Sequence, residues 1–352
     1  MRPRTTVRAA MAATATAVAT IAFAATGGAP AYAAAGTAPA NSTLLPGHVF
    51  APYWESYNGD NAATLSQQSG AKFLSAAFIQ TASSGSCTAY WDGSTSMPIA
   101  QSTFGSEFSQ IQSSGGNVIP SFGGYTADTT NTDIADSCTS VSSIAKVYEN
   151  TITTYNVPRI DLDVEANSLT NTAGWTRRNQ AVKMAEAWGR STGHHVNFSF
   201  TMPVTPNGLT SGEDQILQNA VADGDHFILN IMTFDYYTGQ TYEMAQQTET
   251  AAQGAFSELQ SLYPSKTASQ IWHMLGVTEM VGIDDFGAPE TFTEADATTV
   301  LNWAKSKGID MISFWAIERD NGGCPGVKGA GTCSGIVQPT WYFSQHFEPF
   351  TS

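Results

Sequence analysis

Short apolar runs alternate with longer amphipathic stretches along most of the chain. Each run has five to nine residues and is rich in β-branched and aromatic side chains, a pattern typical of buried strands. The intervening stretches, such as Ser142–Tyr155 and Thr293–Lys307, repeat apolar residues at helical spacing. The eight predicted strands are His48–Tyr53, Lys72–Ile79, Asn117–Phe122, Arg159–Glu165, Val196–Met202, His226–Phe234, Ile271–Val277 and Met311–Trp315.

Alternating strands and helices predict an α/β fold in which helices cover a parallel sheet. Eight strand–helix units close into a TIM barrel, and 352 residues are enough for one. An open doubly wound sheet is the alternative, but it needs a Gly-rich phosphate turn after the first strand. This chain has Tyr53-Trp54-Glu55-Ser56 there, so the sequence predicts a single (β/α)8 barrel.

The N-terminal residues have the pattern of a secretory signal peptide. Three arginines precede an uncharged apolar run, residues 9–25, and Ala31-Tyr32-Ala33 has the small-x-small spacing of a cleavage site. A membrane anchor is the alternative, but this run is shorter than the ~20 residues that span a bilayer. We predict a signal peptide (1–34), a short tail (35–46) and one catalytic barrel (47–352) in a secreted, extracellular protein with no membrane association after cleavage.

The chain is acidic, with a formal net charge of −15. Loss of residues 1–34 removes three Arg and no acid, so −15 becomes −18. Such a charge disfavours nucleic acid and anionic membranes as partners, and suits a neutral or weakly cationic substrate. Solubility alone also accounts for the acidity, so it does not identify the substrate.

Four cysteines in an exported chain predict two disulfides. Cys324 and Cys333 bracket a Gly-rich loop, which leaves Cys87 for Cys138, although the sequence alone leaves three pairings open. A zinc site is the competing interpretation, but the chain lacks CxxC and HxxxH spacings and its six His are scattered. We therefore expect no metal.

In a parallel barrel the chemistry lies at the carboxyl ends of the strands. In this sequence, aromatic and acidic residues dominate those ends. Sugar rings stack on aromatic side chains and hydrogen-bond through their hydroxyls, so the pattern predicts a carbohydrate cleft. The residues concerned are Tyr53, Trp54, Phe78, Ser121–Gly124, Glu165, Met202, Pro203, Asp235, Tyr236 and Trp315.

Three acids alternate along the fourth predicted strand. Asp161, Asp163 and Glu165 point to one face, and the apolar residues between them point to the other. Two carboxyl groups about 5 Å apart repel by roughly 3 kcal/mol at an effective dielectric near 20, or about two pKa units. That shift keeps a proton on one acid near neutral pH, and Glu165 is the outermost. Calcium binding or capping of a neighbouring element is the alternative role for such a run.

The motifs resemble glycoside hydrolase family 18, the chitinases, over nearly the whole mature chain. The acids match the last three acidic places of the DxxDxDxE motif, and Ser121-Phe122-Gly123-Gly124 matches SxGG. Met232-Thr233-Phe234-Asp235-Tyr236 matches MxxDY, and Trp315 ends the eighth strand, as in the family. The segments LGVT from Leu275 and FWAIERD from Phe314 resemble its bacterial branch.

The chain departs from the family pattern at three points. Pro158 replaces the first Asp of the long motif, and Phe234 stands where many members have a Tyr that bonds the acetamido group. Ala166-Asn167 follows Glu165 in place of the usual Gly. Two sources for the missing hydroxyl are open, Tyr236 or a group elsewhere in the cleft.

The resemblance also implies substrate-assisted retaining hydrolysis, without a cofactor. Glu165 is then the acid and base, Asp163 orients the acetamido group, Asp161 shares a proton with Asp163, and Tyr236 assists catalysis. The implied substrate-binding residues are Asp235, Met232, Trp315, Tyr53, Trp54, Phe234, Ser121 and Gly123.

These features predict a secreted, monomeric chitinase that acts on chitin or N-acetylglucosamine oligosaccharides. One alternative is a hydrolase of the same fold that acts on another N-acetylglucosamine linkage, in N-glycan cores or peptidoglycan. The other is a sugar-binding barrel without turnover, against which the presence of all three acids argues.

Overall fold

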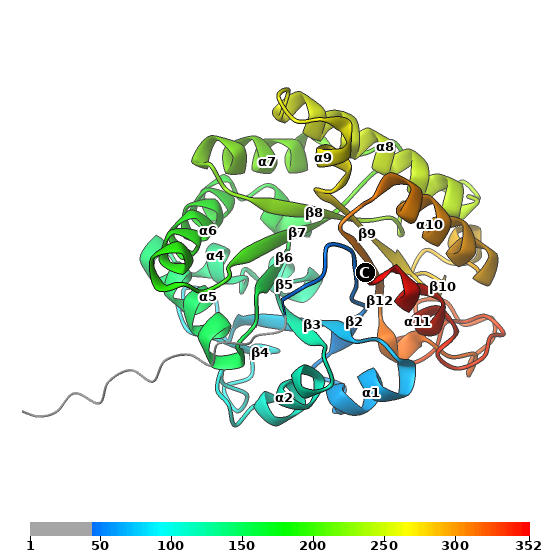
Figure 1. Ribbon diagram of the computed structural model, residues 1–352, viewed down its shortest axis with the longest axis horizontal. Coiled ribbons are helices and arrows are strands. Elements are labelled where there is room, and N and C mark those ends of the chain that lie inside the picture. The colour runs from blue at the N-terminus through cyan, green and yellow to red at the C-terminus, as the bar shows by residue number, and fades with distance from the viewer. Residues whose placement is uncertain (1–43) are drawn as a thin grey trace, which may run out of the picture. The chain divides into compact units, whose positions relative to one another are not determined.

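A ring of parallel strands forms the centre of the protein, as the computed structural model shows for residues 44–352 (Figure 1). The strand order is β1-β12-β9-β8-β7-β6-β5-β3-β2, and β1 and β2 are consecutive pieces of one strand, so the ring has eight positions. This confirms the predicted (β/α)8 barrel. The wall strands are β1 (Val49–Phe50), β2 (Tyr53–Glu55), β3 (Phe73–Thr81), β5 (Asn117–Gly123), β6 (Arg159–Asp163), β7 (Asn197–Pro203), β8 (Phe227–Met232), β9 (Leu275–Met280) and β12 (Met311–Trp315).

Helices surround the ring, and three short strands lie outside it: β4 (Ala89–Trp91), β10 (Gly282–Ile283) and β11 (Thr291–Phe292). The α-helices are α1 (Ala62–Ser69), α2 (Gly105–Ser113), α3 (Tyr125–Thr130), α4 (Ile134–Ser137), α5 (Val141–Tyr155), α6 (Thr172–Thr192), α7 (Ser211–Asp223), α8 (Met244–Leu262), α9 (Ala268–Trp272), α10 (Glu294–Lys307) and α11 (Tyr342–Phe347). The 3-10 helices are η1 (Ala166–Leu169), η2 (Ala288–Glu290), η3 (Ile317–Arg319) and η4 (Glu348–Phe350).

The seventh predicted strand is wrong in its first half. Thr267 and Gln270 form a capping box that starts α9, so Ile271 and Trp272 are helical and the strand begins at Leu275. The Trp272 ring stacks on Phe256 of α8 at a centroid distance of 4.5 Å. The apolar run is therefore buried by a helix, which periodicity over so few residues does not distinguish from a strand.

The first wall strand is interrupted at Pro52, because proline has no N–H to give to a neighbouring strand. The ring still closes across this point. Ala51 N donates to Ile312 O of β12 (3.0 Å), and Pro52 O accepts from Ser75 N of β3 (3.0 Å).

The barrel interior is polar at mid-height, where most TIM barrels carry bulky branched residues. Asn230 Nδ2 donates to Thr201 Oγ1 (3.0 Å) and to Thr278 Oγ1 (2.6 Å) across three neighbouring strands. All three side chains are buried. The main apolar core lies outside the ring, between its wall and the helices. A polar interior layer gives buried acids hydrogen-bond partners that an apolar layer lacks.

Two disulfides lie within the described residues. They join Cys87 to Cys138 and Cys324 to Cys333, one of the three pairings that the sequence left open. The predicted signal peptide and residues 35–43 of the predicted tail lie outside the described residues. Between residues 44 and 352, no helix combines the length and the apolar character needed to cross a membrane.

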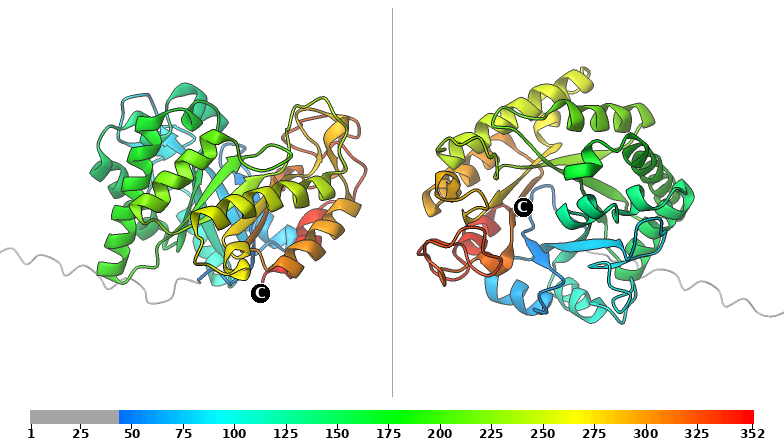
Figure 2. Two further views of the ribbon diagram at one scale, coloured as in Figure 1. Left: turned by 90° about the horizontal axis from the view of Figure 1, so that it is seen from above. Right: turned by 180° about the vertical axis from the view of Figure 1, so that it is seen from behind.

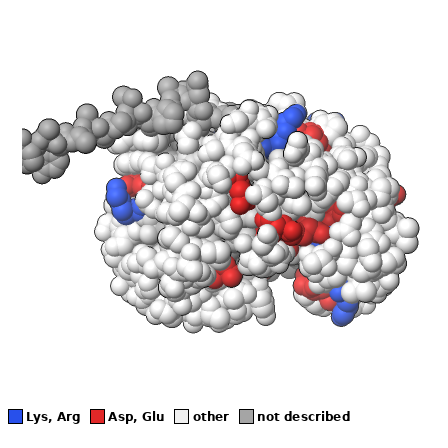
Figure 3. Space-filling model, turned by 90° about the horizontal axis from the view of Figure 1, so that it is seen from below, with Lys and Arg blue, Asp and Glu red and all other residues white. Residues whose placement is uncertain are grey.

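The carboxyl ends of the strands lie at the end of the barrel opposite the C-terminus, because Ser352 N bonds His48 O beside the start of the first strand. In the left view of Figure 2, the segments at the carboxyl ends rise as two lobes. The space-filling surface is notched at the lower edge of Figure 3, and acidic side chains outnumber basic ones on that face. The acidic surface agrees with the net charge of −15.

Candidate active site

Asp161 is the innermost of the three acids and is held by four hydroxyl groups. Its Oδ2 accepts hydrogen bonds from Tyr53 Oη (2.9 Å) and Ser121 Oγ (2.7 Å). Its Oδ1 accepts from Ser199 Oγ (2.6 Å) and Thr201 Oγ1 (2.8 Å). Burial raises the pKa of Asp161, while these donors oppose the shift. Asp161 is therefore a fixed carboxyl group beneath the cleft.

Asp163 lies two residues further along β6, on the same face. Its carboxyl group lines the cleft, yet Oδ1 is buried and has no hydrogen-bond partner among residues 44–352. Burial, followed by the charges of Glu165 and Asp161, holds the pKa of Asp163 well above its ordinary value. The protonated form is thus favoured, and the carboxyl group remains available to a ligand.

Gly123 of β5 pairs with Asp163 in the sheet register and lines the cleft beside it. Its φ is 98°, and a Cβ atom at this position would lie 2.0 Å from the Asp163 carbonyl oxygen. Only glycine allows this approach, so Gly123 serves the placement of β6 as well as the shape of the cleft.

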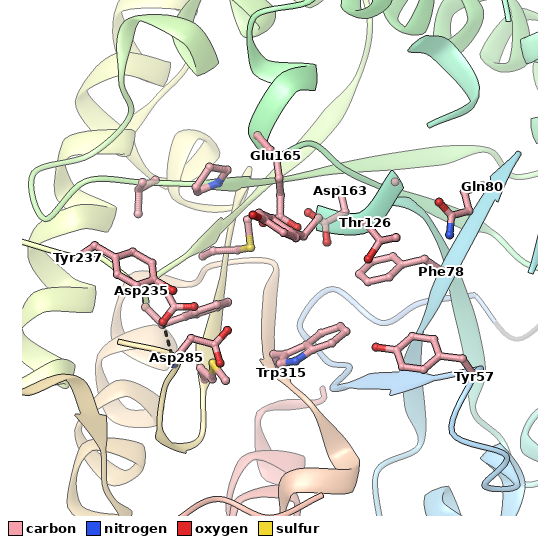
Figure 4. A pocket seen from close by; sticks show the side chains of 18 of the residues that line it. Tyr57, Phe78, Gln80, Thr126, Asp163, Glu165, Asp235, Tyr237, Asp285 and Trp315 are labelled. Carbon is pink, nitrogen blue, oxygen red and sulfur yellow. Dashed lines mark hydrogen bonds between the residues drawn. The ribbon is translucent and has the colours of Figure 1, made fainter. Parts of the chain in front are cut away.

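Glu165 lies just beyond the end of β6, and its side chain points into the cleft (Figure 4). Burial raises its pKa from 4.5 to about 7, and a hydrogen bond from the Tyr125 main chain opposes the shift. The shift has the predicted direction but a different cause. The expected repulsion acts on the pKa of Asp163, and a protonated Asp163 carries no charge that would repel Glu165.

The cleft has a volume of about 910 Å³ and lies between the strand ends and the loops that follow them. Trp315 and Phe78 form one apolar surface in it, with ring centroids 5.5 Å apart and planes 12° from parallel. Both face the side of the cleft that holds Asp163 and Glu165 (Figure 4). Of the other predicted substrate-binding residues, Met232, Phe234, Asp235 and Gly123 line the same cleft.

Asp235 follows β8 and connects two loops. Its Oδ1 accepts hydrogen bonds from the main-chain N atoms of Asp285 (3.0 Å) and Phe286 (3.2 Å). Burial, followed by the charges of Asp284 and Asp285, raises its pKa to about 8. Asp235 therefore fixes the loop opposite Glu165 and presents a carboxyl group that favours the protonated form at neutral pH.

Two predicted site residues face away from the cleft. Trp54 is 1% exposed and packs edge-on against Phe104 and Phe108 outside the barrel wall. The prediction of a sugar contact at Trp54 is wrong because Tyr53 points inward, and alternation along β2 directs the next side chain outward.

Tyr236 is the second. Its ring packs against Tyr242 at 5.5 Å, and its hydroxyl is buried without a partner among residues 44–352, outside the lining of the cleft. The predicted catalytic role is therefore not supported. Asp235 and Tyr237 both have φ of 52°, so the chain turns after β8 and the alternation assumed for a strand ends at Met232.

Tyr53 and Ser121 contribute indirectly, since both are buried and donate hydrogen bonds to Asp161. The sequence argument missed several cleft residues that lie beyond the strand ends, in loops or at the start of α3. Of these, Tyr57, Tyr125 and Tyr237 are large and exposed, by 43%, 66% and 59%. Each follows a predicted strand within a few residues, a position that could have identified them.

Asp235, Asp284 and Glu290 bring carboxylate oxygens within 4.8 Å of one another, as a metal site would. Each of them also accepts main-chain hydrogen bonds from the surrounding loops, such as Tyr236 N to Glu290 Oε2 (2.7 Å). These hydrogen bonds explain the cluster, because the three carboxylates anchor the surrounding loops.

A (β/α)8 barrel whose fourth strand directs three acids toward a Trp-floored cleft is the architecture of a TIM-barrel glycoside hydrolase. The sequence comparison specifies the family. Residues 49–298 match the model of the glycosyl hydrolases family 18, and the chain belongs to that family.

Curated relatives agree with the family. The chain is 29% identical over 322 residues to a probable bifunctional chitinase/lysozyme of Escherichia coli (strain K12), covering 87% of this chain and 35% of the relative. It is 30% identical over 226 residues to endochitinase 11 of Metarhizium anisopliae, covering 61% of this chain and 42% of the relative. The chain thus spans about two fifths or less of the length of these relatives.

Solved structures agree as well. Active domain 2 of a Pyrococcus furiosus chitinase, crystallised as catalytic-site mutants, is 29% identical with a TM-score of 0.76, over 87% of this chain and 95% of that one. A second structure of mutants of that domain, complexed with chito-oligosaccharides, is 28% identical with a TM-score of 0.74, over 88% and 97%.

Proposed function

We propose that the protein is an exported chitinase that cleaves β-1,4 links between N-acetylglucosamine units with retention of configuration. The observation that carries the proposal is Glu165, an acid with a pKa of about 7 in an open cleft, beside Asp163, whose buried Oδ1 has no hydrogen-bond partner among residues 44–352. The relatives named as chitinases support the same activity.

In the first step, Glu165 gives its proton to the glycosidic oxygen as the bond from that oxygen to the anomeric carbon breaks. The carbonyl oxygen of the sugar's own 2-acetamido group attacks the anomeric carbon from the opposite face, giving an oxazolinium ion. Asp163 passes its proton to Asp161 as the sugar binds. The resulting carboxylate accepts a hydrogen bond from the acetamido N–H and balances the positive charge, for which its buried Oδ1, unpartnered among residues 44–352, is suited.

In the second step, the ionised Glu165 takes a proton from water, whose oxygen attacks the anomeric carbon and opens the oxazolinium ring. Trp315 and Phe78 form the floor under the sugar, and Met232 and Asp235 flank it. A sugar without a 2-acetamido group has no internal nucleophile, so cellulose is excluded as a substrate of this mechanism.

The test is hydrolysis of N-acetyl-chitooligosaccharides of two to six units, with products followed by mass spectrometry and the first-formed anomer by NMR. We expect wild type to release the β-anomer. Glu165→Gln should lower kcat by about 10²–10⁴-fold, the usual contribution of a general acid, and should still bind the oligomers.

Glu279→Gln is a matched control. Glu279 is also a buried glutamate, with a pKa raised by burial to about 8, but it bonds Thr248 of α8 outside the barrel. We expect its kcat to stay within about threefold of wild type. A wild type that binds oligomers and never cuts them would instead be a sugar-binding barrel.

Peptidoglycan is a second candidate substrate, because the E. coli relative is named a bifunctional chitinase/lysozyme. The glycan strand of peptidoglycan also carries 2-acetamido groups. Release of muropeptides without cleavage of chitin oligomers would favour this candidate over chitin.

Export is supported by the signal-peptide pattern of residues 1–34 and by the two disulfides, which persist in oxidising compartments. The intact mass of protein recovered from culture medium tests it. We expect a chain that begins at residue 35.

A further inference from the structure

Glu165 is not held by the strand that precedes it. β6 ends at Asp163, and Glu165 is extended, with φ −130° and ψ 178°. Ala166 then has a φ of 41°, a left-handed conformation that is unfavourable for any residue with a Cβ atom. The backbone around the acid therefore needs an external hold to keep this geometry.

Helix α3 contains the atoms that meet this need. Asp128 is fully buried, and its Oδ2 accepts a hydrogen bond from the main-chain N–H of Glu165. The main chain of Tyr125, on the same helix, lies close enough to the Glu165 carboxylate to lower its pKa. One short helix thus contacts the acid at both its backbone and its side chain.

The helix is itself placed relative to β6. Asp128 N donates to Gly124 O (3.0 Å), and Gly124 N donates to Asp163 O (3.2 Å). Gly124 has a φ of 84°, and a Cβ atom there would lie 2.7 Å from the Phe78 ring. The position of Asp128 therefore follows from the strand that carries Asp161 and Asp163.

The loop after Glu165 rests on the same elements. Asn167 Nδ2 donates to Thr129 O of α3 (3.3 Å), and Asn171 Nδ2 donates to Asp136 Oδ1 of α4 (3.0 Å). Ser168 Oγ also bonds Asp136. None of these three side-chain contacts reaches Glu165, whereas Asp128 accepts the Glu165 main-chain N–H directly.

We propose that Asp128 is a positioning residue that holds the general acid in place by accepting the Glu165 main-chain hydrogen bond. This inference rests on the proposed function, because it assigns Asp128 a task in the same reaction. Asp128 acts through the backbone and does not touch the substrate. A general acid displaced by about 1 Å loses up to about 10²-fold in rate, so a single bond at this place matters.

The surroundings of Asp128 indicate that it acts as a neutral group. Burial, followed by the charge of Asp133, holds the pKa of Asp128 well above its ordinary value, while Arg178 opposes the shift. Arg178 Nη2 forms an ion pair with Asp133 Oδ1 at 3.0 Å. Asp136 and Asp163 are further acids in the surroundings of Asp128. Asparagine reproduces a protonated aspartic acid, since it keeps one acceptor and one donor.

The experiment compares Asp128→Ala with Asp128→Asn on N-acetyl-chitooligosaccharides. We expect Asp128→Ala to lower kcat by about 10- to 100-fold with KM within twofold of wild type. Asp128→Asn should keep kcat within threefold and leave the alkaline limb of the pH profile unchanged. Glu107→Ala is the control and should keep kcat. It removes a carboxylate of α2 that accepts a hydrogen bond from the main-chain N of Ala62 in α1 (2.7 Å).

Hydrogen exchange of the segment 164–171, measured without substrate, separates this inference from the proposed function. Faster exchange in Asp128→Ala than in Asp128→Asn supports the hold on Glu165 even if wild type cuts no chitin. Equal exchange in both variants, or a wild-type kcat in Asp128→Ala, overturns it. If Asp128→Ala does not fold, Asp128→Asn is compared with wild type. A shifted alkaline limb of its pH profile, or faster hydrogen exchange of segment 164–171 than in wild type, then overturns the inference.

Discussion

Three acids of similar chemistry, two on β6 and one just beyond its end, have different properties because their surroundings differ. Asp161 is bonded by four hydroxyls, Asp163 has an unpartnered buried oxygen, and Glu165 faces the open cleft. Burial raises the pKa of all three, and hydrogen bonds moderate the shift at Asp161. Only Glu165 combines access to a ligand with a pKa of about 7, which is what a general acid at neutral pH requires.

The pH dependence of activity follows from that pKa. The first step needs protonated Glu165, whose pKa is raised from 4.5 to about 7, so the protonated form is lost as pH rises through about 7. We expect kcat/KM for chitin oligomers to fall on the alkaline side with an apparent midpoint near 7. An alkaline midpoint near 4.5 would contradict the raised pKa.

At the residue scale, spacing along β6 predicted which acids share a face, and Asp161 and Asp163 do. The same argument from alternation failed at Tyr236 after β8, because the positive φ of Asp235 and Tyr237 ends the alternation after Met232. Backbone turns of this kind are set by contacts with other loops, such as the Glu290 carboxylate that accepts Tyr236 N. A local pattern does not contain those contacts.

At the scale of elements, β2 has two faces with separate tasks. Tyr53 points into the barrel and donates to Asp161, while Trp54 points outward and packs against α2. Both side chains are about 1% exposed, so burial alone does not distinguish them.

Substitutions at these neighbours should separate the two faces. Tyr53→Phe removes one donor to Asp161, and we expect a stability loss of about 1–3 kcal/mol in urea titration together with a lower kcat. Trp54→Phe leaves a cavity in the outer core and should cost about 1–3 kcal/mol with kcat and KM unchanged. A raised KM in Trp54→Phe would support the sugar contact that the sequence predicted for Trp54.

Elements differ in how far their sequences determine them. The sequence predicted a helix over Thr293–Lys307, and Thr293 and Asp296 form the capping box that starts α10. Residues 271–272 were predicted as strand and are helical, because the cap at Thr267 and the stacking on Phe256 outweigh a short apolar run.

At the scale of the whole molecule, the two disulfides close loops of different length. Cys87 and Cys138 are 51 residues apart, whereas Cys324 and Cys333 are 9 apart. In the chain-entropy description, the longer loop contributes about 4 kcal/mol to stability and the shorter one about 2.5 kcal/mol.

We therefore expect the double variant Cys87→Ser, Cys138→Ser to lose more stability in urea titration than Cys324→Ser, Cys333→Ser. The reverse order would mean that native contacts of the 324–333 loop outweigh loop entropy. Arg319 already bonds this loop at Ala330 O, so that outcome has a structural basis.

The sequence by itself determined the number and order of the wall strands, the inward face of β6 and about half of the residues that line the cleft. These follow from periodicity and from the rule that parallel strands carry the chemistry at their carboxyl ends. Only the tertiary structure decided which carboxyl groups keep a proton and which tyrosines reach the cleft. The contact by which Asp128 holds Glu165 also comes from the tertiary structure alone. Those properties depend on burial and on contacts between segments distant in the chain, and a linear pattern contains neither.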